Sequence, residues 1–566
     1  MRDILEGLYN TDDEKGRQKA AWCSFFFYLF LLLSFIISIC ASVKCTKSYL
    51  NKTLFTYKFP MYESATDIPA GVPVSLSVRG YVQRGGGFGI YRNLRLEKDE
   101  EFRRLKTEVL LNGKVLVAAY TGKLLLLTLN GLEYDEDFSY DLPLDRYRRG
   151  IEVDHLIKLS ESRCVVIGNN EMITVTIQSE VIGKKEVPTP VFGKEHFILE
   201  EAETTAFPHV DSLDNTTVAF IFEKNYQLWA GTATWAGEGT ESRMEKNKVA
   251  IANEECIYKF HGVAGMSKDK FIIAAVGHPN NGTEQDRVPG DLRAKVATVA
   301  SDGSLTFGEW TTRWFTDSSN WFSLDNFNSW QALACYYDGF EGNGVVAINM
   351  FLAEDRSKVE FGGYVMVENG GASIDYQKIE MRILSQDRFG VFFPDASANG
   401  NLIFMMGERT ANNELTRIGS NFVVARQARR AKEGNFWFSI APVNSFQFTL
   451  LDSFKGTLNG ETITYSSLNM GYHYAYPVGI TTNRGGKEKY IQFNGVYTFA
   501  ANSDVTLKPG YTYYTNSKGE LVRGRPYGYN HAEYGAFYVD TGDEICALHN
   551  QIGIAVSEKE LLIRTY

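Results

Sequence analysis

A short loop near residue 400 has residue types and a spacing that could bind a metal ion. Asp395, Ser397 and Asn399 alternate along it and a glycine follows, as the ligands at positions 1, 3 and 5 and the glycine at position 6 do in calcium loops. The template is incomplete, because Ile403 and Met406 stand where it has a ninth-position oxygen and a bidentate Glu. Asp395, Ser397 and Asn399 are therefore a candidate calcium site, with a polar hairpin turn as the alternative.

Other residue patterns do not define a catalytic site. The eight histidines have no zinc-binding spacing, and no Gly-x-Ser-x-Gly nucleophile elbow occurs. The glycine-rich stretch 85–89 lacks the Gly-Lys-Ser/Thr of a phosphate loop. A sialidase-like glycosidase would need arginines and paired carboxylates at one place, and the candidates are Arg148, Arg293, Arg313, Arg388 and Asp317. The catalytic residues stay unknown, and we expect no cofactor other than calcium.

The elements that would position these residues follow an internal repeat. A turn of the form Leu-Ser-x-x-Arg precedes a run of apolar β-formers at 159–167 and again at 384–393. An apolar residue followed by glycine then marks a later strand, at Gly193, Gly308 and Gly362. The fully apolar run indicates a strand that is covered on both faces, and we expect the glycine to permit a tight bend.

The spacing of these landmarks predicts the fold class. A unit of roughly 50–60 residues with about four short strands is typical of one β-propeller blade. Six such units lie between 108 and 430, and strands from 74–92 and 436–451 could combine into a seventh blade. The sequence thus predicts an all-β protein with a six- or seven-bladed β-propeller, and a tandem of β-sandwiches is the structural alternative.

The repeat resembles a β-propeller repeat that is widespread in large cell-surface proteins of protists, algae and bacteria. The shared features are a Leu-Asp or Leu-Ser turn, an apolar strand and a closing Phe-Gly, as at Leu213-Asp214, Leu384-Ser385 and Phe361-Gly362. This resemblance implies a propeller architecture and a location at the cell surface. It implies nothing about activity.

A small Tyr-rich β-module is expected after the propeller. Beyond residue 452 the repeat stops, and Leu507-Lys508-Pro509-Gly510 precedes Tyr513-Tyr514. The tyrosines could form a platform on which sugars stack, but ordinary strand propensity favours a Tyr-rich core and sheet edge.

A membrane anchor is predicted at residues 20–43. This run of 24 residues is uncharged and rich in Phe, Leu and Ile. It is long enough to cross a hydrocarbon core of roughly 30 Å, and longer than the apolar region of a cleaved signal peptide. The basic residues on the two sides of the span are equal in number, so they do not indicate its orientation. The orientation is therefore inferred from the glycosylation sequons at Asn51, Asn215 and Asn281, which all follow the span. They favour an extracellular or lumenal domain over a cytoplasmic one.

Composition narrows the range of partners. The net charge of −10 argues against a nucleic-acid ligand, whose phosphates need a basic surface. Among the seven cysteines, Cys45 is juxtamembrane and unmatched, which makes it a candidate for an intermolecular disulfide in a homo-oligomer. Cys164 and Cys335 occupy equivalent positions of the repeat, so we expect them to be buried on different blades.

The expected organisation is a cytoplasmic tail at 1–19, a signal-anchor helix at 20–43, a stalk at 44–66, a β-propeller at 67–451 and a C-terminal β-module at 452–566. The expected function is that of a type II single-pass protein of the plasma membrane or endomembranes. Its propeller would be a non-catalytic binding or adhesion scaffold for a protein or glycan. The alternatives are a membrane-anchored glycoside hydrolase and a structural surface-coat component.

Overall fold

The computed structural model describes most strands of the chain. The described ranges, which contain short gaps, are 56–60, 68–76, 82–96, 106–198, 209–279, 291–313, 322–395, 401–526 and 538–564, together with Tyr28, Leu29 and Ser34. Apart from these three helical residues, the 3-10 turn Gly239–Glu241 and Asn550, which is also in 3-10 conformation, the regular elements described are β-strands. They divide into two compact units. The small unit comprises 1–84, 478–509 and 552–565, and the ring unit comprises 85–477 and 510–551.

Most of the predicted anchor at 20–43 lies outside the described residues. Tyr28, Leu29 and Ser34 are described there, and all three are helical and exposed. Within the described part of the chain, no helix has the length and apolar character that crossing a membrane requires. Other predicted positions outside the described residues are Cys45, Asn51, Arg148, Asn281, Asp317, Ser397 and Asn399.

In the described part of the ring unit, six antiparallel sheets follow one another along the chain. The first sheet contains β5 (Lys106–Val109), β6 (Lys114–Ala118), β7 (Lys123–Asn130) and β8 (Glu133–Asp141). The second contains β9 (Val153–Lys158), β10 (Arg163–Gly168), β11 (Glu171–Ile182), β12 (Lys185–Phe192) and β13 (Phe197–Ile198). The third contains β14 (His209–Ser212), β15 (Thr217–Lys224), β16 (Gln227–Ala236) and β17 (Arg243–Asn253).

The next three sheets repeat this order. The fourth sheet contains β18 (Cys256–Ser267), β19 (Lys270–Pro279), β20 (Asp291–Val299), β21 (Leu305–Phe307) and β22 (Thr311–Arg313). The fifth contains β23 (Phe322–Asn328), β24 (Gln331–Asp338), β25 (Gly344–Leu352) and β26 (Val359–Asn369). The sixth contains β27 (Glu380–Ile383), β28 (Arg388–Asp395), β29 (Asn401–Arg409) and β30 (Leu415–Ala425).

A further sheet combines segments from three parts of the chain. Its strands, in order, are β31 (Lys432–Asn444), β32 (Gln447–Leu458), β33 (Glu461–His473), β4 (Phe88–Leu96), β40 (Glu544–Ala547) and β39 (Tyr538–Asp540). The N-terminal strand β4 pairs antiparallel with β33, from Ser466 opposite Leu96 to His473 opposite Phe88. The predicted propeller boundary at 451 therefore falls inside β32, because β33 is needed to join β32 to β4.

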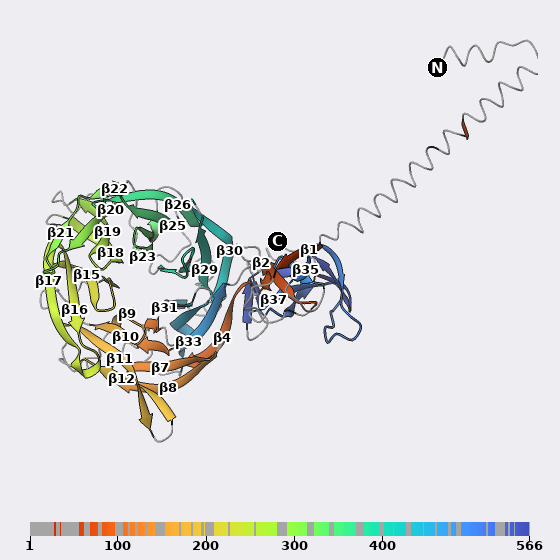
Figure 1. Cartoon of the computed structure of the whole chain (residues 1–566), viewed down its shortest axis with the longest axis horizontal. Helices are drawn as coiled ribbons and strands as arrows, with labels where there is room; N and C mark the ends of the chain where they lie inside the picture. Colours follow the sequence, from red (N-terminus) through yellow and green to blue (C-terminus); the bar gives the residue numbers. More distant parts are fainter. Residues whose placement is uncertain are drawn as a thin grey trace, which may run out of the picture. The chain divides into compact units, whose positions relative to one another are not determined.

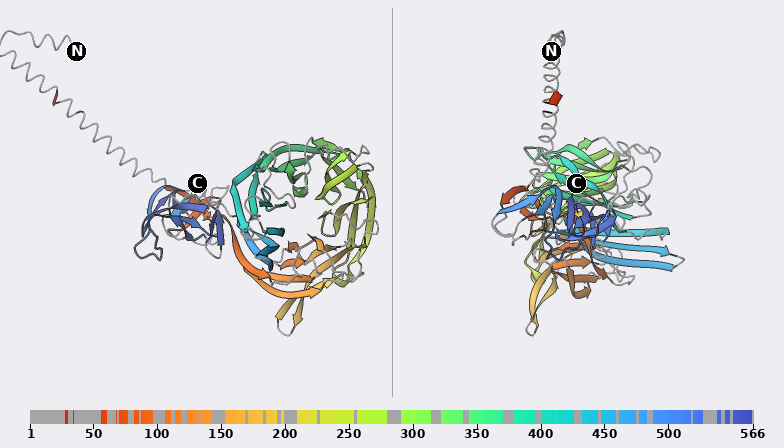
Figure 2. Two further views of the ribbon diagram at one scale, coloured as in Figure 1. Left: turned by 180° about the vertical axis from the view of Figure 1, so that it is seen from behind. Right: turned by 90° about the vertical axis from the view of Figure 1, so that its right-hand side faces the viewer.

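The sheets of the ring unit form a closed ring. The first strand of each sheet contacts the first strand of the next, in the cycle β5, β9, β14, β18, β23, β27, β31 and back to β5. These first strands, among them β9, β23 and β31, lie on the inner side of the ring, and β8, β12 and β17 lie on its outer side (Figure 1). The view from behind shows the same closure (Figure 2). This arrangement is that of a β-propeller, as the sequence predicts.

The repeat turn joins the first and second strands of a sheet, and its hydrogen bonds recur. The N–H groups of Leu159, Leu213 and Leu384 donate to the carbonyls of Arg163, Thr217 and Arg388, respectively. The apolar run that follows is the second strand, and its side chains are buried, as in β10. Neighbouring sheets cover both faces of this strand, which explains its uninterrupted apolar character. Cys164 and Cys335 are buried on β10 and β24, as predicted.

The glycines that close the repeat unit serve a different purpose from the one predicted. A Cβ at Gly193 would lie 2.4 Å from Thr174 Oγ1, and one at Gly308 would lie 2.3 Å from the Ser357 carbonyl oxygen. Neither glycine has a positive φ. The repeat therefore uses glycine here because neighbouring groups approach closely, rather than to make a tight bend.

The small unit contains two groups of paired strands. β1 (Thr56–Pro60), β35 (Glu488–Gln492), β34 (Gly479–Thr481), β2 (Pro73–Leu76) and β3 (Val82–Arg84) pair in that order. β36 (Gly495–Thr498) pairs with β42 (Glu560–Ile563), which pairs with β41 (Gln551–Ser557). Residues from the start and the end of the chain thus share this unit, which differs from the purely C-terminal module expected. In the ring unit, β37 (Tyr511–Thr515) pairs with β38 (Leu521–Pro526).

Candidate functional site on the inner strands

Four charged side chains occupy the same position in four first strands of the ring. Glu108, Asp211, Asp325 and Arg382 each stand two residues before the apolar residue that begins the repeat turn, namely Leu110, Leu213, Phe327 and Leu384. Equivalent sheet registers confirm the correspondence, since these four residues lie opposite Leu116, Ala219, Leu333 and Gly390 of the second strands. We call Glu108, Asp211, Asp325 and Arg382 the axial charged layer.

Two carboxylates of this layer tie neighbouring first strands together. Asp211 Oδ2 accepts the backbone N–H of Gly265 on β18 at 2.7 Å, and Asp325 Oδ2 accepts that of Ile383 on β27 at 2.8 Å. The Asp325 carboxylate also lies 4.0 Å from Arg382 Nη1. In each case an aspartate of one sheet holds the strand of the next sheet.

Burial and mutual charge perturb the ionisation of the layer. Burial, with the nearby Asp325 charge, raises the pKa of Asp211 to about 7. Burial also raises the pKa values of Glu108 and Asp325, against the opposing charge of Arg382. Burial disfavours the charged guanidinium of Arg382, but the carboxylates, Asp325 foremost, outweigh this and raise its pKa. Three acids thus share one arginine.

A second layer of polar side chains lies two residues earlier on the same strands. Side chains at i and i+2 of a strand point to the same face, so Lys106, His209, Ser323 and Glu380 follow the axial charged layer along the ring's inner side. Ties between sheets recur here. Ser323 Oγ accepts the N–H of Met381 at 3.1 Å, Glu380 accepts that of Ile440 at 3.0 Å, and Ser439 accepts that of Thr107 at 3.3 Å.

Three histidines from adjacent first strands pack against one another. The ring centroids of His155 and His209 are 5.6 Å apart, and those of His209 and His261 are 4.9 Å apart with perpendicular planes. Burial, aided by Lys106, lowers the pKa of His209 to about 4, and burial lowers that of His261 well below its usual value. All of the described His, Cys, Asp and Glu side chains taken together contain no group of three placed to hold a metal ion.

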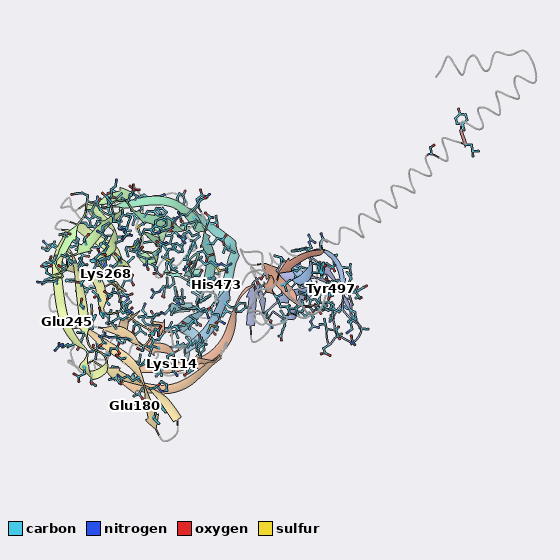
Figure 3. The ribbon with its side chains drawn as sticks, viewed as in Figure 1. Lys114, Glu180, Glu245, Lys268, His473 and Tyr497 are labelled. Carbon is cyan, nitrogen blue, oxygen red and sulfur yellow. The ribbon has the colours of Figure 1, made fainter. Side chains whose placement is uncertain are left out.

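The residues that the sequence singled out lie elsewhere. Asp395 ends β28, and the following residues 396–400 are outside the described ranges, so the calcium site stays a prediction. Arg293 and Arg313 lie on β20 and β22, away from the first strands. Arg388 begins β28, and its Nη1 donates to the carbonyl oxygen of His473 at 2.5 Å, which joins two neighbouring sheets; Figure 3 labels His473. None of these described arginines belongs to the axial charged layer.

The repeat itself contains a signal for the axial charged layer, which a search for catalytic motifs does not detect. Once the repeats are aligned on the turn, the position two residues before it holds Glu108, Asp211, Asp325 and Arg382, but Ile157 and Ala264 in two other units. Charged residues at one equivalent position of several repeats indicate that these positions lie close together in the ring.

The tyrosines of the expected sugar-stacking platform are buried. Tyr513 is 4% exposed and Tyr514 1% exposed, which agrees with a Tyr-rich core. Among the described aromatic side chains of the ring unit, Trp330 and Tyr364 are exposed. Trp330 stacks on Phe351, with ring centroids 5.5 Å apart, so one face of its indole is supported.

No protein-family model and no curated protein matches this sequence. Solved structures with similarity include a Lactobacillus plantarum protein, at 8% identity over 65% of this chain and 95% of that chain with a TM-score of 0.35. The C-terminal WD40 domain of Sif2 is 9% identical over 67% of this chain and 99% of that chain, with a TM-score of 0.33. Hsv2 of Kluyveromyces marxianus is 6% identical over 64% of this chain and 96% of that chain, with a TM-score of 0.31. Likeness at this level carries no argument about activity. The β-propeller class rests on the sheets and their closure into a ring.

Proposed function

We propose that this protein is a membrane-anchored binding scaffold whose seven sheets are the blades of a seven-bladed β-propeller. The anchor is the helix at 20–43, and the ring lies on the extracellular or lumenal side as a type II ectodomain. Its ligand is a protein or a glycan bound at the rim of the ring. The supporting features are the apolar run at 20–43, the sequons that follow it and the closed ring of sheets.

One observation carries the non-catalytic part of this proposal. Both oxygens of the Asp211 carboxylate accept backbone N–H groups, from Ser212 at 2.8 Å and from Gly265 at 2.7 Å. Those of Asp325 do the same with Asn326 at 2.9 Å and Ile383 at 2.8 Å. Carboxylates with this bonding serve as ties between strands, whereas a general acid or nucleophile must direct an oxygen at a substrate.

The test uses the full-length chain in detergent or nanodiscs. We expect saturable binding on a glycan array or in a protein-binding screen, and we expect that Trp330→Ala weakens it if the ligand stacks on this exposed indole. Lys268→Met, at another exposed position of the ring unit, is the matched control. Absence of any ligand in both screens would contradict the scaffold function. Carbonate extraction of membranes tests the anchor separately, because a chain that carbonate releases does not span the bilayer.

The axial charged layer favours one alternative, a glycoside hydrolase. Such an enzyme needs carboxyl groups with raised pKa values near an arginine, and Asp211 has a pKa of about 7 in a layer that contains Arg382. Assays with aryl glycosides, sialosides included, decide between the two. Hydrolysis that Asp211→Asn abolishes in a folded protein would establish the enzyme and overturn the scaffold.

A further inference from the structure

Three apolar side chains are exposed on one sheet of the small unit. Val496 is 44% exposed, Val556 47% and Leu562 37%, and they lie on β36, β41 and β42. The alternating residues Tyr497 and Leu561 are buried; Figure 3 labels Tyr497. This sheet therefore has one packed face, and on the opposite face Val496 and Leu562 are exposed to solvent whereas Ile554 is buried.

The strand register makes Val496 and Leu562 neighbours, whereas Val556 lies at an irregularity of β41 between Ala555 and Ser557. Val496 lies directly opposite Leu562, and Leu562 lies directly opposite Ile554. Directly opposite residues of an antiparallel pair point to the same face, with Cβ atoms about 5 Å apart. An apolar row thus crosses three strands and ends at β36, which pairs with β42 alone among the described strands. The row ends at a sheet edge whose outer backbone groups can accept another strand.

We propose that β36 pairs antiparallel with β36 of a second copy of this chain, in a two-fold symmetric dimer. The symmetry axis passes beside Val496, so this residue lies opposite the same residue of the partner copy. A shift by one residue would set the outward Val496 against the inward Tyr497, which the alternation of the strand forbids. In the proposed register the apolar row becomes continuous across the dimer, from Leu562 of one copy to that of the other.

A second copy fits this surface better than a lipid surface does. The row carries no Trp, Lys or Arg, and Glu560 lies two residues before Leu562 on the same face of β42. The backbone N–H and C=O groups of a sheet edge need hydrogen-bonding partners, which a strand supplies and a hydrocarbon phase does not.

The inference rests on the proposed anchor in one respect. The chain from residue 43, the end of the predicted span, to Thr56 of β1 reaches at most about 45 Å. The small unit is then held near the bilayer, and two anchored copies meet in one plane with the same orientation. This confinement raises their effective concentration, so a short edge strand suffices for pairing.

The test is disulfide trapping of the full-length chain in membranes, in a Cys45→Ser background. In Val496→Cys the two thiols would face each other across the dimer axis, at a separation that a disulfide can bridge. We expect a covalent dimer after mild oxidation. The matched control is Val556→Cys, an equally exposed position on β41, which we expect to stay monomeric. No dimer at Val496→Cys, or equal dimer at both positions, would overturn the proposal.

Val496→Lys gives a second measurement. An edge lysine opposes pairing between copies and leaves the packed face unchanged, so we expect the mass of the full chain in mild detergent to fall from dimer to monomer with the same melting temperature per protomer. A persistent dimer would contradict the proposed interface. Carbonate extraction distinguishes the dimer from the anchor. If the chain stays in the membrane after carbonate treatment and forms no disulfide-linked dimer, the dimer alone is contradicted. If carbonate releases the chain and the disulfide-linked dimer still forms, the anchor alone is contradicted.

Discussion

Asp325 and Arg382 form an ion pair between two neighbouring first strands of the ring, with Oδ2 and Nη1 4.0 Å apart. The same Oδ2 accepts the N–H of Ile383 at 2.8 Å, so this carboxylate contacts both a side chain and the backbone of β27. The side chain of Asp325 is 15% exposed and that of Arg382 30%. Because both charges are largely removed from water, each offsets part of the cost of burying the other, and Arg382 favours the ionised form of Asp325.

Arg382→Met should destabilise the ring in a pH-dependent way. The substitution leaves Glu108, Asp211 and Asp325 without the arginine whose charge favours their ionised forms. We expect the free energy of unfolding to fall by about 3 kcal/mol at pH 8 and by less at pH 5, where the acids take up protons. Urea unfolding at both pH values measures this. Lys268→Met should change stability by less than about 0.5 kcal/mol, and a loss at Arg382 that is equal at both pH values would contradict the mechanism.

Asp211 should make stability fall as the pH rises. Its pKa is about 7 in the folded chain, against about 3.9 in an unfolded one, so the folded state binds the proton more tightly. Its contribution to stability is fully present below pH 4 and is lost as the pH rises to about 7. In unfolding experiments, Asp211→Asn should reduce the change in the free energy of unfolding between pH 4 and pH 7. An unchanged slope between pH 4 and 7 would show that Asp211 ionises normally.

Gly362 and Gly363 form an internal pair of test and control. A Cβ at Gly362 would lie 2.4 Å from Phe351 Cε2 and 3.1 Å from the Asn349 Cβ, whereas one at Gly363 meets nothing within 4 Å. We expect Gly362→Ala to cost about 1–3 kcal/mol, because the half-buried Phe351 and the buried Asn349 must move. Gly363→Ala should be neutral or slightly stabilising. Equal melting temperatures for the two variants would contradict the packing shown at β26.

Arg388 should stabilise the junction between two sheets through His473. Its Nη1 donates to the His473 carbonyl at 2.5 Å, and burial lowers the pKa of His473 to about 3, so the imidazole is neutral beside the guanidinium. We expect Arg388→Met to lower the free energy of unfolding by about 2 kcal/mol, as the loss of a charged hydrogen bond does. Arg388→Lys should recover part of the loss. If the Lys and Met variants are equally destabilised, packing rather than the hydrogen bond is responsible.

Asn215 provides a test of orientation. It is exposed in the turn between β14 and β15. In a eukaryotic secretory system we expect a mobility shift on endoglycosidase treatment that Asn215→Gln reduces by one glycan. If the wild-type chain inserts in membranes and carries no glycan at this position, the ring does not enter the lumen.

The strands and their repeat can be predicted from the sequence because local interactions determine them. A second strand covered on both faces is apolar throughout, and the turn that precedes it recurs with the same hydrogen bonds at Leu159, Leu213 and Leu384. The strand class, the repeat and the burial of Cys164 and Cys335 follow from this local pattern.

The sequence predicts that strands from 74–92 and 436–451 combine into one blade, and the tertiary structure decided that β4 alone of the described N-terminal strands joins that sheet, through β33. The composition of the ring's centre was decided by the tertiary structure alone. β4 pairs with β33 although no periodicity relates the two segments, because a sheet edge is satisfied by any strand that arrives with the right register. Glu108, Asp211, Asp325 and Arg382 are distant in sequence, and each looks like an ordinary strand residue. They become one charged layer because closure places their strands around a common centre, where burial and mutual charge shift their pKa values.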